Sequence, residues 1–167
     1  MKPEYHIHQR PKIVEKRGRL GDWEIDTLLG GRGGGGLVSA VDRKSRYLVL
    51  TLISNKSAAE AERAICLSLP AKTVKMITMD NGSEFANFKN IQKRLKAKVY
   101  FAAPHSPWQR GSIENINGLI RWFSLKDMIS NPLLNSRSNW FRTLLTTGHA
   151  NVSDGSLLNR SFLPCCT

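Results

Sequence analysis

Two acidic residues, Asp80 and Glu114, frame the stretch of this sequence whose residue types could do chemistry. A helix and a strand are expected between them, and a sheet with crossover helices can fold such a segment back so that both carboxylates converge at one end. Converging carboxylates repel each other, and they persist mainly where a divalent cation neutralises them. The two acids therefore predict a metal site.

The elements that would position these acids can be predicted from local composition. Asp80 follows a short apolar run, residues 74–79, that predicts a buried strand, and a tight turn is expected directly after it. Glu114 follows a Pro- and Gly-rich loop and begins a helix expected over residues 113–123. On that helix Glu114, Asn117 and Arg121 share one face. Such a face could hold a metal ion and a phosphate together, and it could equally be an ordinary solvated face.

The first third of the chain predicts three consecutive antiparallel strands. Residues 21–30 alternate Trp and Ile with the acids Asp22, Glu24 and Asp26, so one face of this strand is acidic. An exposed acidic face is the ordinary alternative to a functional one. A glycine-rich turn follows, which is no phosphate-binding loop because it lacks the Lys-Ser/Thr ending. Residues 37–53 then add two β-rich runs separated by a short turn.

Alternating helices and strands complete the predicted fold. Ser57 caps a helix that Pro70 ends. After the strand over residues 74–79, a helix is expected from about residue 84 to 96, with Asn81 or Ser83 as its cap, and residues 98–103 form a fifth strand. The predicted class is α/β, with three antiparallel strands followed by alternating helices and strands in a five-stranded mixed sheet.

Net charge is the strongest global property of the chain. A formal net charge of +12 and a pI near 10.1 imply a polyanionic partner, most often nucleic acid. A ribosome-associated protein, or a basic protein without such a partner, is the alternative. On the helix expected over residues 84–96, Lys89 and Lys93 belong to a basic face that would either contact DNA or be solvated.

Composition argues against several other classes of protein. A hydrophobic content of 41% and a mean hydropathy of −0.31 fit a soluble globular chain. No apolar run approaches the roughly 20 residues of a membrane span, and the first residues lack the apolar segment typical of secretion. Cys66, Cys165 and Cys166 form neither a disulfide framework nor a zinc-binding spacing. A cytoplasmic location without a membrane partner is expected.

Four segments of the chain resemble a known family: GDWEIDTLLG, VDRKSRYLVL, TMDNGSEFAN and PHSPWQRGSIENINGLIR. Over about residues 11–123 the sequence is similar to the catalytic core of bacterial insertion-sequence transposases of the IS-thirty type. The resemblance implies a ribonuclease H-like fold and a DDE triad at Asp26, Asp80 and Glu114, which would be both catalytic residues and metal ligands. It also selects Asp26 over the other two acids of its strand, a choice that alternation leaves open.

The implied reaction is metal-dependent cleavage and strand transfer at phosphodiesters of DNA. Such in-line displacements use two Mg²⁺ ions, roughly 3.5–4 Å apart, that activate the attacking oxygen and stabilise the leaving one. Mn²⁺ is expected to substitute. Hard cations of this kind take carboxylate oxygens in preference to His or Cys ligands, which matches the three acids.

DNA is the implied partner, both as the ends of an insertion element and as a target. The residues expected to bind it are Gln109, Arg110, Asn117, Arg121, Lys89 and Lys93. For Gln109, Arg110 and Asn117 the alternative is loop ordering and helix capping. Trp108 could stack on a base, although packing within its loop is favoured. A homo-oligomer and a nucleoid-associated place in the bacterial cytoplasm are further expectations.

The resemblance divides the chain into three parts. Residues 1–20 would be a basic linker or arm, which contacts phosphates or is simply solvated, and residues 21–123 would be the catalytic core. Residues 124–167 depart from the family pattern, and a shift of reading frame near Phe123 would explain the departure. This tail is expected to have low order. The helix-turn-helix region that precedes the core in the family is expected to be missing.

Two other functions are left open by the sequence. The chain could be the remnant of a decayed element that binds DNA but catalyses nothing, or a ribonuclease H-type nuclease. The loop SPWQRGS favours the transposase branch over the nuclease. Metal-dependent DNA nicking that requires Asp80 would separate the active enzyme from the remnant.

Overall fold

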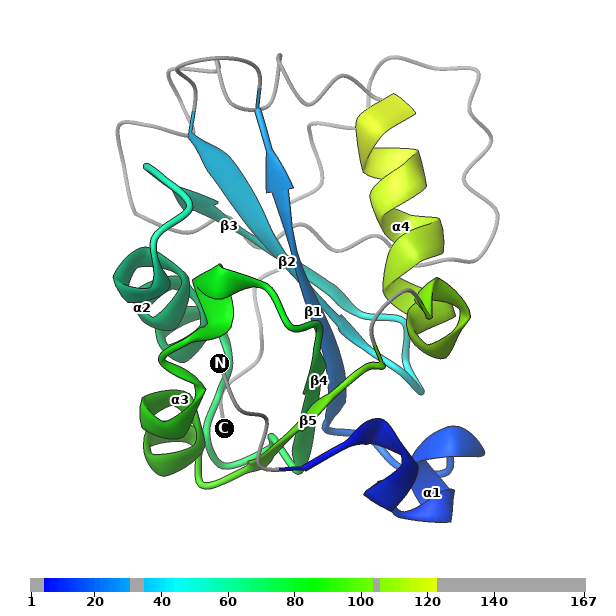
Figure 1. Cartoon of the computed structure of the whole chain (residues 1–167). Coiled ribbons are helices and arrows are strands. Elements are labelled where there is room, and N and C mark those ends of the chain that lie inside the picture. The colour runs from blue at the N-terminus through cyan, green and yellow to red at the C-terminus, as the bar shows by residue number, and fades with distance from the viewer. Residues whose placement is uncertain (1–4, 31–34, 104–105, 123–167) are drawn as a thin grey trace, which may run out of the picture.

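A five-stranded mixed sheet organises the residues that the computed structural model describes, which are 5–30, 35–103 and 106–122. The strands lie in the order β3-β2-β1-β4-β5 (Figure 1). The first three, β1 (Asp22–Leu29), β2 (Gly36–Asp42) and β3 (Leu48–Ile53), are antiparallel neighbours. The last two, β4 (Met76–Met79) and β5 (Lys98–Phe101), run parallel to β1. The predicted fold class is confirmed.

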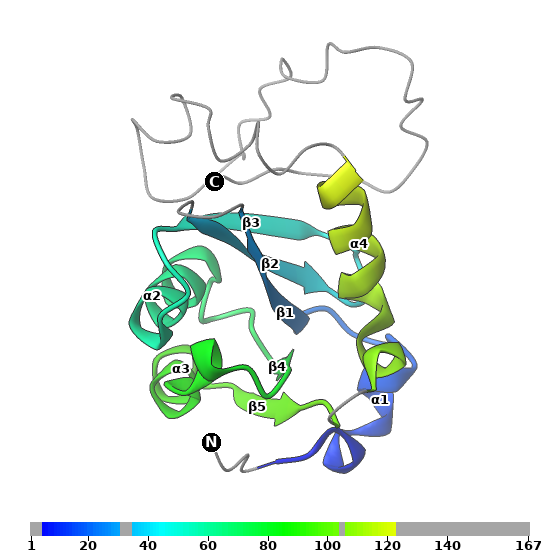
Figure 2. The same ribbon diagram turned by 45° about the horizontal axis from the view of Figure 1, so that its top comes forward.

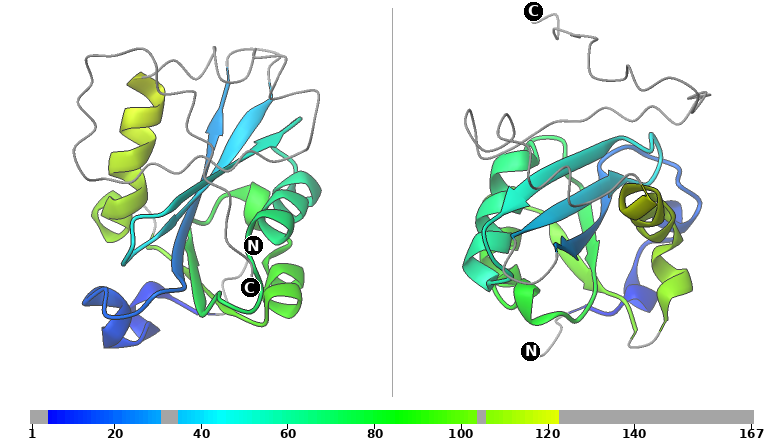
Figure 3. Two further views of the ribbon diagram at one scale, coloured as in Figure 1. Left: turned by 180° about the vertical axis from the view of Figure 1, so that it is seen from behind. Right: turned by 90° about the horizontal axis from the view of Figure 1, so that it is seen from above.

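Helices cover both faces of this sheet. Helices α2 (Ala58–Ser68) and α3 (Phe88–Leu95) lie together on one face, and α4 (Gly111–Trp122) lies on the other, as Figure 2 shows. The view from above in Figure 3 separates the same three layers. Because each face of the sheet is covered, strand residues of both orientations are buried, and polar side chains of β1 are enclosed with them.

The alternation of β1 assigns its side chains to the two layers. Trp23 and Ile25 belong to the larger hydrophobic cluster, which includes the core residues of α2 and α3. Leu28 belongs to a second cluster with Ile113 and Ile116 of α4. The acids Asp22, Glu24 and Asp26 alternate with Trp23 and Ile25 and so point toward the α4 side. The alternative that this acidic face is exposed is wrong, because Asp22 and Glu24 are 1% and 0% exposed.

Helix α2 follows the predicted capping pattern. The Ser57 hydroxyl accepts a hydrogen bond from the backbone N–H of Glu60, so the first turn has a satisfied donor. The helix ends before Pro70, which cannot continue it. Ala61, Ala64 and Ile65 are buried against the sheet at helical spacing. These predictions are confirmed.

The helix predicted over residues 84–96 is divided into two pieces. A 3-10 turn, Ser83–Phe85, precedes α3, which begins only at Phe88. The division follows from burial of Glu84 and Phe85, which are 3% and 0% exposed. Neither Asn81 nor Ser83 is the cap of α3: the cap position is Asn87, whose side-chain amide donates to Glu62 instead.

Residues 5–20, expected from sequence to be a linker or arm, pack against the sheet. His6 forms an isolated parallel bridge with Phe101, so this segment extends the sheet beyond β5. A 3-10 turn (Ile7–Gln9) and the short helix α1 (Lys12–Glu15) follow. Val14 is fully buried with Tyr100 and its neighbours, and the Arg10 guanidinium donates to the Thr78 hydroxyl at 3.2 Å. The segment is a structural part of the core.

Several predictions concern residues that the structure does not describe. The tail over residues 124–167 and the reading-frame hypothesis near Phe123 both lie outside the described ranges. Within the described ranges, no helix combines the length and the apolar character needed to cross a bilayer.

Candidate active site

Asp26 and Asp80 lie at the same level of two neighbouring parallel strands. The β1–β4 register pairs Glu24 with Thr78, and carried two residues further it sets Asp26 beside Asp80. Asp80 directly follows β4, where the strand ends and side chains are free to converge. The register therefore places two carboxylates at one end of the sheet, whereas the convergence predicted from sequence is that of Asp80 with Glu114, and Asp26 is implied by the resemblance alone.

A guanidinium lies between the two carboxylates. Nη1 of Arg110 is 3.7 Å from Oδ1 of Asp26, and Nη2 is 3.4 Å from Oδ2 of Asp80. Arg110 ends the 3-10 turn Pro107–Arg110, which runs directly into α4. Its side chain is 11% exposed, against 19% for Asp26 and 35% for Asp80. The cluster is thus a pair of acids that opens to solvent at Asp80 and shares one cation.

Asn117 fixes the orientation of Asp26. Its side-chain amide donates to Oδ2 of Asp26 at 2.9 Å, while its amide oxygen accepts a hydrogen bond from the Ser39 hydroxyl at 2.8 Å. Ser39 is the cross-strand partner of Asp26 on β2. Both polar ends of this buried side chain are therefore engaged, and Asn117 joins α4 to the strand that carries the acid.

Glu24 fixes the start of α4. Its carboxylate is fully buried, forms an ion pair with Arg43, and accepts a hydrogen bond from the backbone N–H of Ile113 at 2.9 Å. The first turn of a helix presents unpaired N–H donors and a partial positive charge, so a buried carboxylate is stabilised there. Sequence reasoning missed this role: alternation puts Glu24 on the face of Asp26, but nothing local identifies Ile113 as its partner.

Glu114, the third acid of the predicted triad, directly follows Ile113 and is half-buried. The structure does not bring it into the cluster of Asp26 and Asp80: among the described residues, no three His, Cys, Asp or Glu side chains are grouped closely enough to hold a metal ion. Arg110, one helical turn before Glu114, is the group that meets the two aspartates. The site thus consists of two acids in contact with one cation, with the third acid on the adjoining helix.

Burial raises the pKa of the Asp26 carboxyl, and the negative charges of Asp80 and Glu84 raise it further. The charge of Arg110 and the N–H of Thr27 oppose this effect without cancelling it. Burial therefore disfavours the charged form of Asp26 relative to the neutral form.

The turn after Asp80 supports the same region. Oδ1 of Asp80 accepts the N–H of Gly82 at 3.0 Å, and Glu84 turns back so that the Thr27 hydroxyl donates to it at 2.6 Å. A Cβ at position 82 would lie 2.4 Å from a carboxylate oxygen of Glu84, so a larger residue there would displace this side chain. Although burial raises the pKa of Glu84, hydrogen bonds from Thr27 and Lys56 hold it below its usual value.

The remaining predicted residues lie at different places. Gln109 accepts the N–H of Ala103 through its side-chain oxygen, which is the loop-ordering alternative. Trp108 is 74% exposed, so the prediction that it packs within its loop is wrong. Arg121 is exposed on α4, whereas Lys89 and Lys93 are exposed on α3, in the layer across the sheet.

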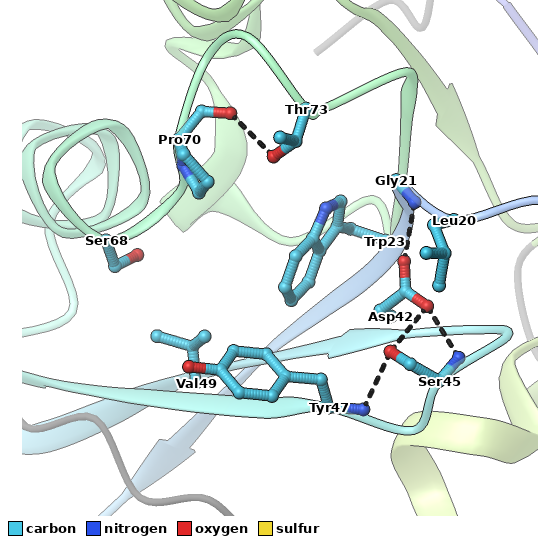
Figure 4. Close-up of a pocket in the computed structure, with 10 residues that line it drawn as sticks. All are labelled: Leu20, Gly21, Trp23, Asp42, Ser45, Tyr47, Val49, Ser68, Pro70 and Thr73. Carbon is cyan, nitrogen blue, oxygen red and sulfur yellow. Dashed lines mark hydrogen bonds between the residues drawn. The ribbon is translucent and has the colours of Figure 1, made fainter. Parts of the chain in front are cut away.

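A cavity of about 300 Å³ lies apart from this cluster. Trp23 and Tyr47 form its centre, as Figure 4 shows, and the carboxylate near it, Asp42, is already bonded to Gly21 and Ser45. Because Trp23 belongs to the layer of α2 and α3, the cavity opens on the face opposite to Asp26. It contributes nothing to the acid pair.

Comparison with known proteins gives consistent results. Residues 17–107 match the family model described as "Integrase core domain". The chain is 40% identical, over 120 residues, to the transposase InsI for insertion sequence element IS30A of Escherichia coli, a match that covers 70% of this chain and 31% of that protein. It is 38% identical, over 134 residues, to the probable transposase for insertion-like sequence element IS1161 of Streptococcus salivarius, covering 76% and 38%.

A solved structure extends the likeness to the fold. The intasome of simian T-cell lymphotropic virus contains a chain that superposes with a TM-score of 0.55 at 22% identity, covering 66% of this chain and 42% of that one. The ribonuclease H-like fold implied by the sequence resemblance is confirmed. This chain spans 31–43% of the length of the curated transposases it matches.

Proposed function

This chain belongs to the integrase core domain family, and from that premise we propose that it is the catalytic core of an insertion-sequence transposase. The proposed activity is metal-dependent cleavage and strand transfer at DNA phosphodiesters. One observation carries the proposal: Asp26 on β1 and Asp80 directly after the adjacent parallel strand β4 lie level with each other and share the cation Arg110. Binding of a hard cation explains such a pair of acids better than packing does, because like charges at close range destabilise the metal-free protein.

The donor set fits Mg²⁺, with Mn²⁺ as a substitute. Asp26 and Asp80 offer carboxylate oxygens, the ligand type that these cations prefer, and they lie close enough to share one cation, Arg110. Glu114 is the proposed third ligand, on the helix that Asn117 joins to Asp26. When bound, a pair of such ions supplies Lewis acidity and lowers the pKa of an attacking water.

The residues of the chain itself provide position and order. Asn117 holds one oxygen of Asp26, while the other accepts the Thr27 N–H and faces Arg110. Glu24 fixes the first turn of α4 relative to β1, and thereby the place of Glu114. In phosphoryl transfer, a protein contributes mainly by holding the reacting and charge-stabilising groups in place before the substrate binds.

DNA is the proposed substrate, as element ends and as target. Trp108 and Arg121 are exposed on the segment that carries Arg110 and Glu114, so they are the proposed contacts beside the acids. Lys89 and Lys93 would add attraction for phosphates from the opposite layer, in keeping with the net charge of +12. A homo-oligomer acting at the bacterial nucleoid completes the proposal.

DNA nicking tests this function directly. Supercoiled plasmid should be nicked in Mg²⁺ or Mn²⁺, should remain intact in EDTA, and should remain intact with the Asp80→Asn protein, because a carboxylate essential to the metal site is then missing. Binding of the same DNA should persist in both cases. Binding without nicking by the wild type in either metal would favour the alternative, a silent remnant of a decayed element.

A further inference from the structure

Arg110 is a buried cation whose hydrogen bonds are incomplete. Its Nη1 has no hydrogen-bond partner, although the atom is shielded from solvent, and it is 3.7 Å from the nearest oxygen of Asp26. Its Nη2 reaches Asp80 only at 3.4 Å. A well-formed charge-assisted hydrogen bond is shorter, about 2.7–2.9 Å. The guanidinium is thus held between the acids mainly by charge and not by close bidentate bonding.

The Arg110 guanidinium lies between Asp26 and Asp80, where a cation bound by the two acids would be expected. It contacts one oxygen of each aspartate, while the other oxygen of Asp26 is bound by Asn117 and the other oxygen of Asp80 by the Gly82 N–H. Of the oxygens directed toward Arg110, Oδ1 of Asp26 also accepts the backbone N–H of Thr27 at 2.8 Å, which leaves it one further lone pair. This oxygen and Oδ2 of Asp80 are the ones available to a metal ion. Because positive charges repel each other at short range, a divalent cation and the guanidinium cannot both occupy this place at low cost.

We propose that Arg110 is an internal counter-ion of the metal site: it neutralises Asp26 and Asp80 while no metal is bound, and a divalent cation must displace it to bind. This inference rests on the proposed function, since it assumes a metal site at these acids. It makes Arg110 a positioning residue that keeps the acid pair together, at the expense of metal affinity.

The place of Arg110 in the chain suits such an exchange. It lies at the junction between a short 3-10 turn and α4, so a change of its side-chain rotamer does not require the helix to move. Trp108, two residues earlier, is exposed, so a displaced guanidinium would emerge on the surface proposed to bind DNA. There it could pair with a phosphate, for which the planar fork of arginine is suited.

Metal affinity measured by titration calorimetry with MgCl₂ and MnCl₂ tests the exchange. Arg110→Gln should bind metal at least about threefold more tightly than the wild type, because no cation then competes for the acids. Arg110→Lys retains the charge and should stay close to the wild type. Lys72→Gln removes the same charge from an exposed turn between α2 and β4 and serves as the control for net charge, with no change expected. Melting curves establish that each variant is folded.

Modification of arginine by phenylglyoxal, mapped by mass spectrometry, provides a second test on the wild-type protein. Mg²⁺ should accelerate modification of Arg110 and leave an exposed arginine such as Arg121 unaffected. Slower modification of Arg110 in Mg²⁺, or a wild-type metal affinity in Arg110→Gln, would overturn the inference alone. Absence of metal binding in the wild type and in Arg110→Gln would overturn the proposed function with it.

Discussion

The backbone N–H of Ile113 donates to the buried carboxylate of Glu24, a residue 89 positions earlier in the chain. Glu24 lies on β1 two residues before Asp26, and Ile113 lies on α4 directly before Glu114. One hydrogen bond therefore sets the relative position of two elements that each carry a proposed metal ligand. The ion pair of Glu24 with Arg43 holds the carboxylate in place.

Replacement of Glu24 should destabilise the protein and loosen α4. Glu24→Gln leaves the buried Arg43 without its counter-charge, which costs about 3–5 kcal/mol in the free energy of unfolding. Urea denaturation measures this loss. The backbone amide of Ile113 should also exchange its hydrogen faster, by a larger factor than the amides of the sheet. The matched control is Asp22→Asn on the same face of β1, whose partner Arg19 can reach solvent when the charge is removed, so that a smaller loss is expected. Equal effects of the two substitutions would contradict the anchoring role.

The raised pKa of Asp26 predicts an inverted pH dependence for this residue. Its carboxyl group favours the neutral form in the folded protein, so its contribution to stability is present below the ordinary value of 3.8 and is lost as the pH rises through the raised pKa. Asp26→Asn should therefore gain stability relative to metal-free wild type as the pH rises from about 3.8 to neutrality. Denaturation in EDTA at several pH values measures the difference, and a constant difference would contradict the prediction.

Much of the fold follows from local sequence, because its signals are local. The alternation of Trp23 and Ile25 with acids identifies β1, and Ser57 with Pro70 delimits α2. The division of the third predicted helix could not be foreseen, since it depends on burial of Glu84 against Thr27, a contact across 57 positions. The packing of Val14 under Tyr100 is equally remote in sequence.

The candidate site shows the same division between local and remote information. The carboxylates of Asp26 and Asp80 could be identified from pattern and resemblance, because a residue type and a strand end are sequence properties. The partners that bury and neutralise them could not: the contacts of Arg110 with Asp80 and of Asn117 with Asp26 join residues 30 and 91 positions apart. Prediction from sequence thus finds the acids but not the groups that balance their charge.

The exposed indole of Trp108 predicts a role in binding and none in folding. Trp108→Ala should leave the free energy of unfolding within about 0.5 kcal/mol of the wild type, because 74% of the residue is already in solvent. Affinity for single-stranded DNA should fall by about 1–3 kcal/mol, the usual contribution of a stacked base. Fluorescence anisotropy measures the affinity, and Trp108→Tyr should recover most of it. A destabilised but fully binding Ala variant would contradict the prediction.

Arg121 should affect both DNA binding and catalysis, whereas Lys89 and Lys93 should affect DNA binding alone. Arg121 lies on the helix of Glu114, whereas Lys89 and Lys93 lie on α3 across the sheet. Removal of any one of these charges should reduce, by about 0.9, the slope of the logarithm of the DNA-binding constant against the logarithm of the salt concentration. Arg121→Gln should also reduce the rate of nicking, while Lys89→Gln with Lys93→Gln should leave the rate at saturating DNA unchanged. A lower nicking rate in the double variant alone would reverse this assignment.

The proposed function requires Asp26 and Asp80 to assemble a metal site, and thermal melting with and without Mg²⁺ or Mn²⁺ tests this requirement most directly. Metal at 100 times its dissociation constant should stabilise the wild type by about 2.7 kcal/mol, and Asp80→Asn should lose that stabilisation while remaining folded. A cooperative wild-type transition that metal does not shift would contradict the proposed metal site, as would an equal shift in Asp80→Asn.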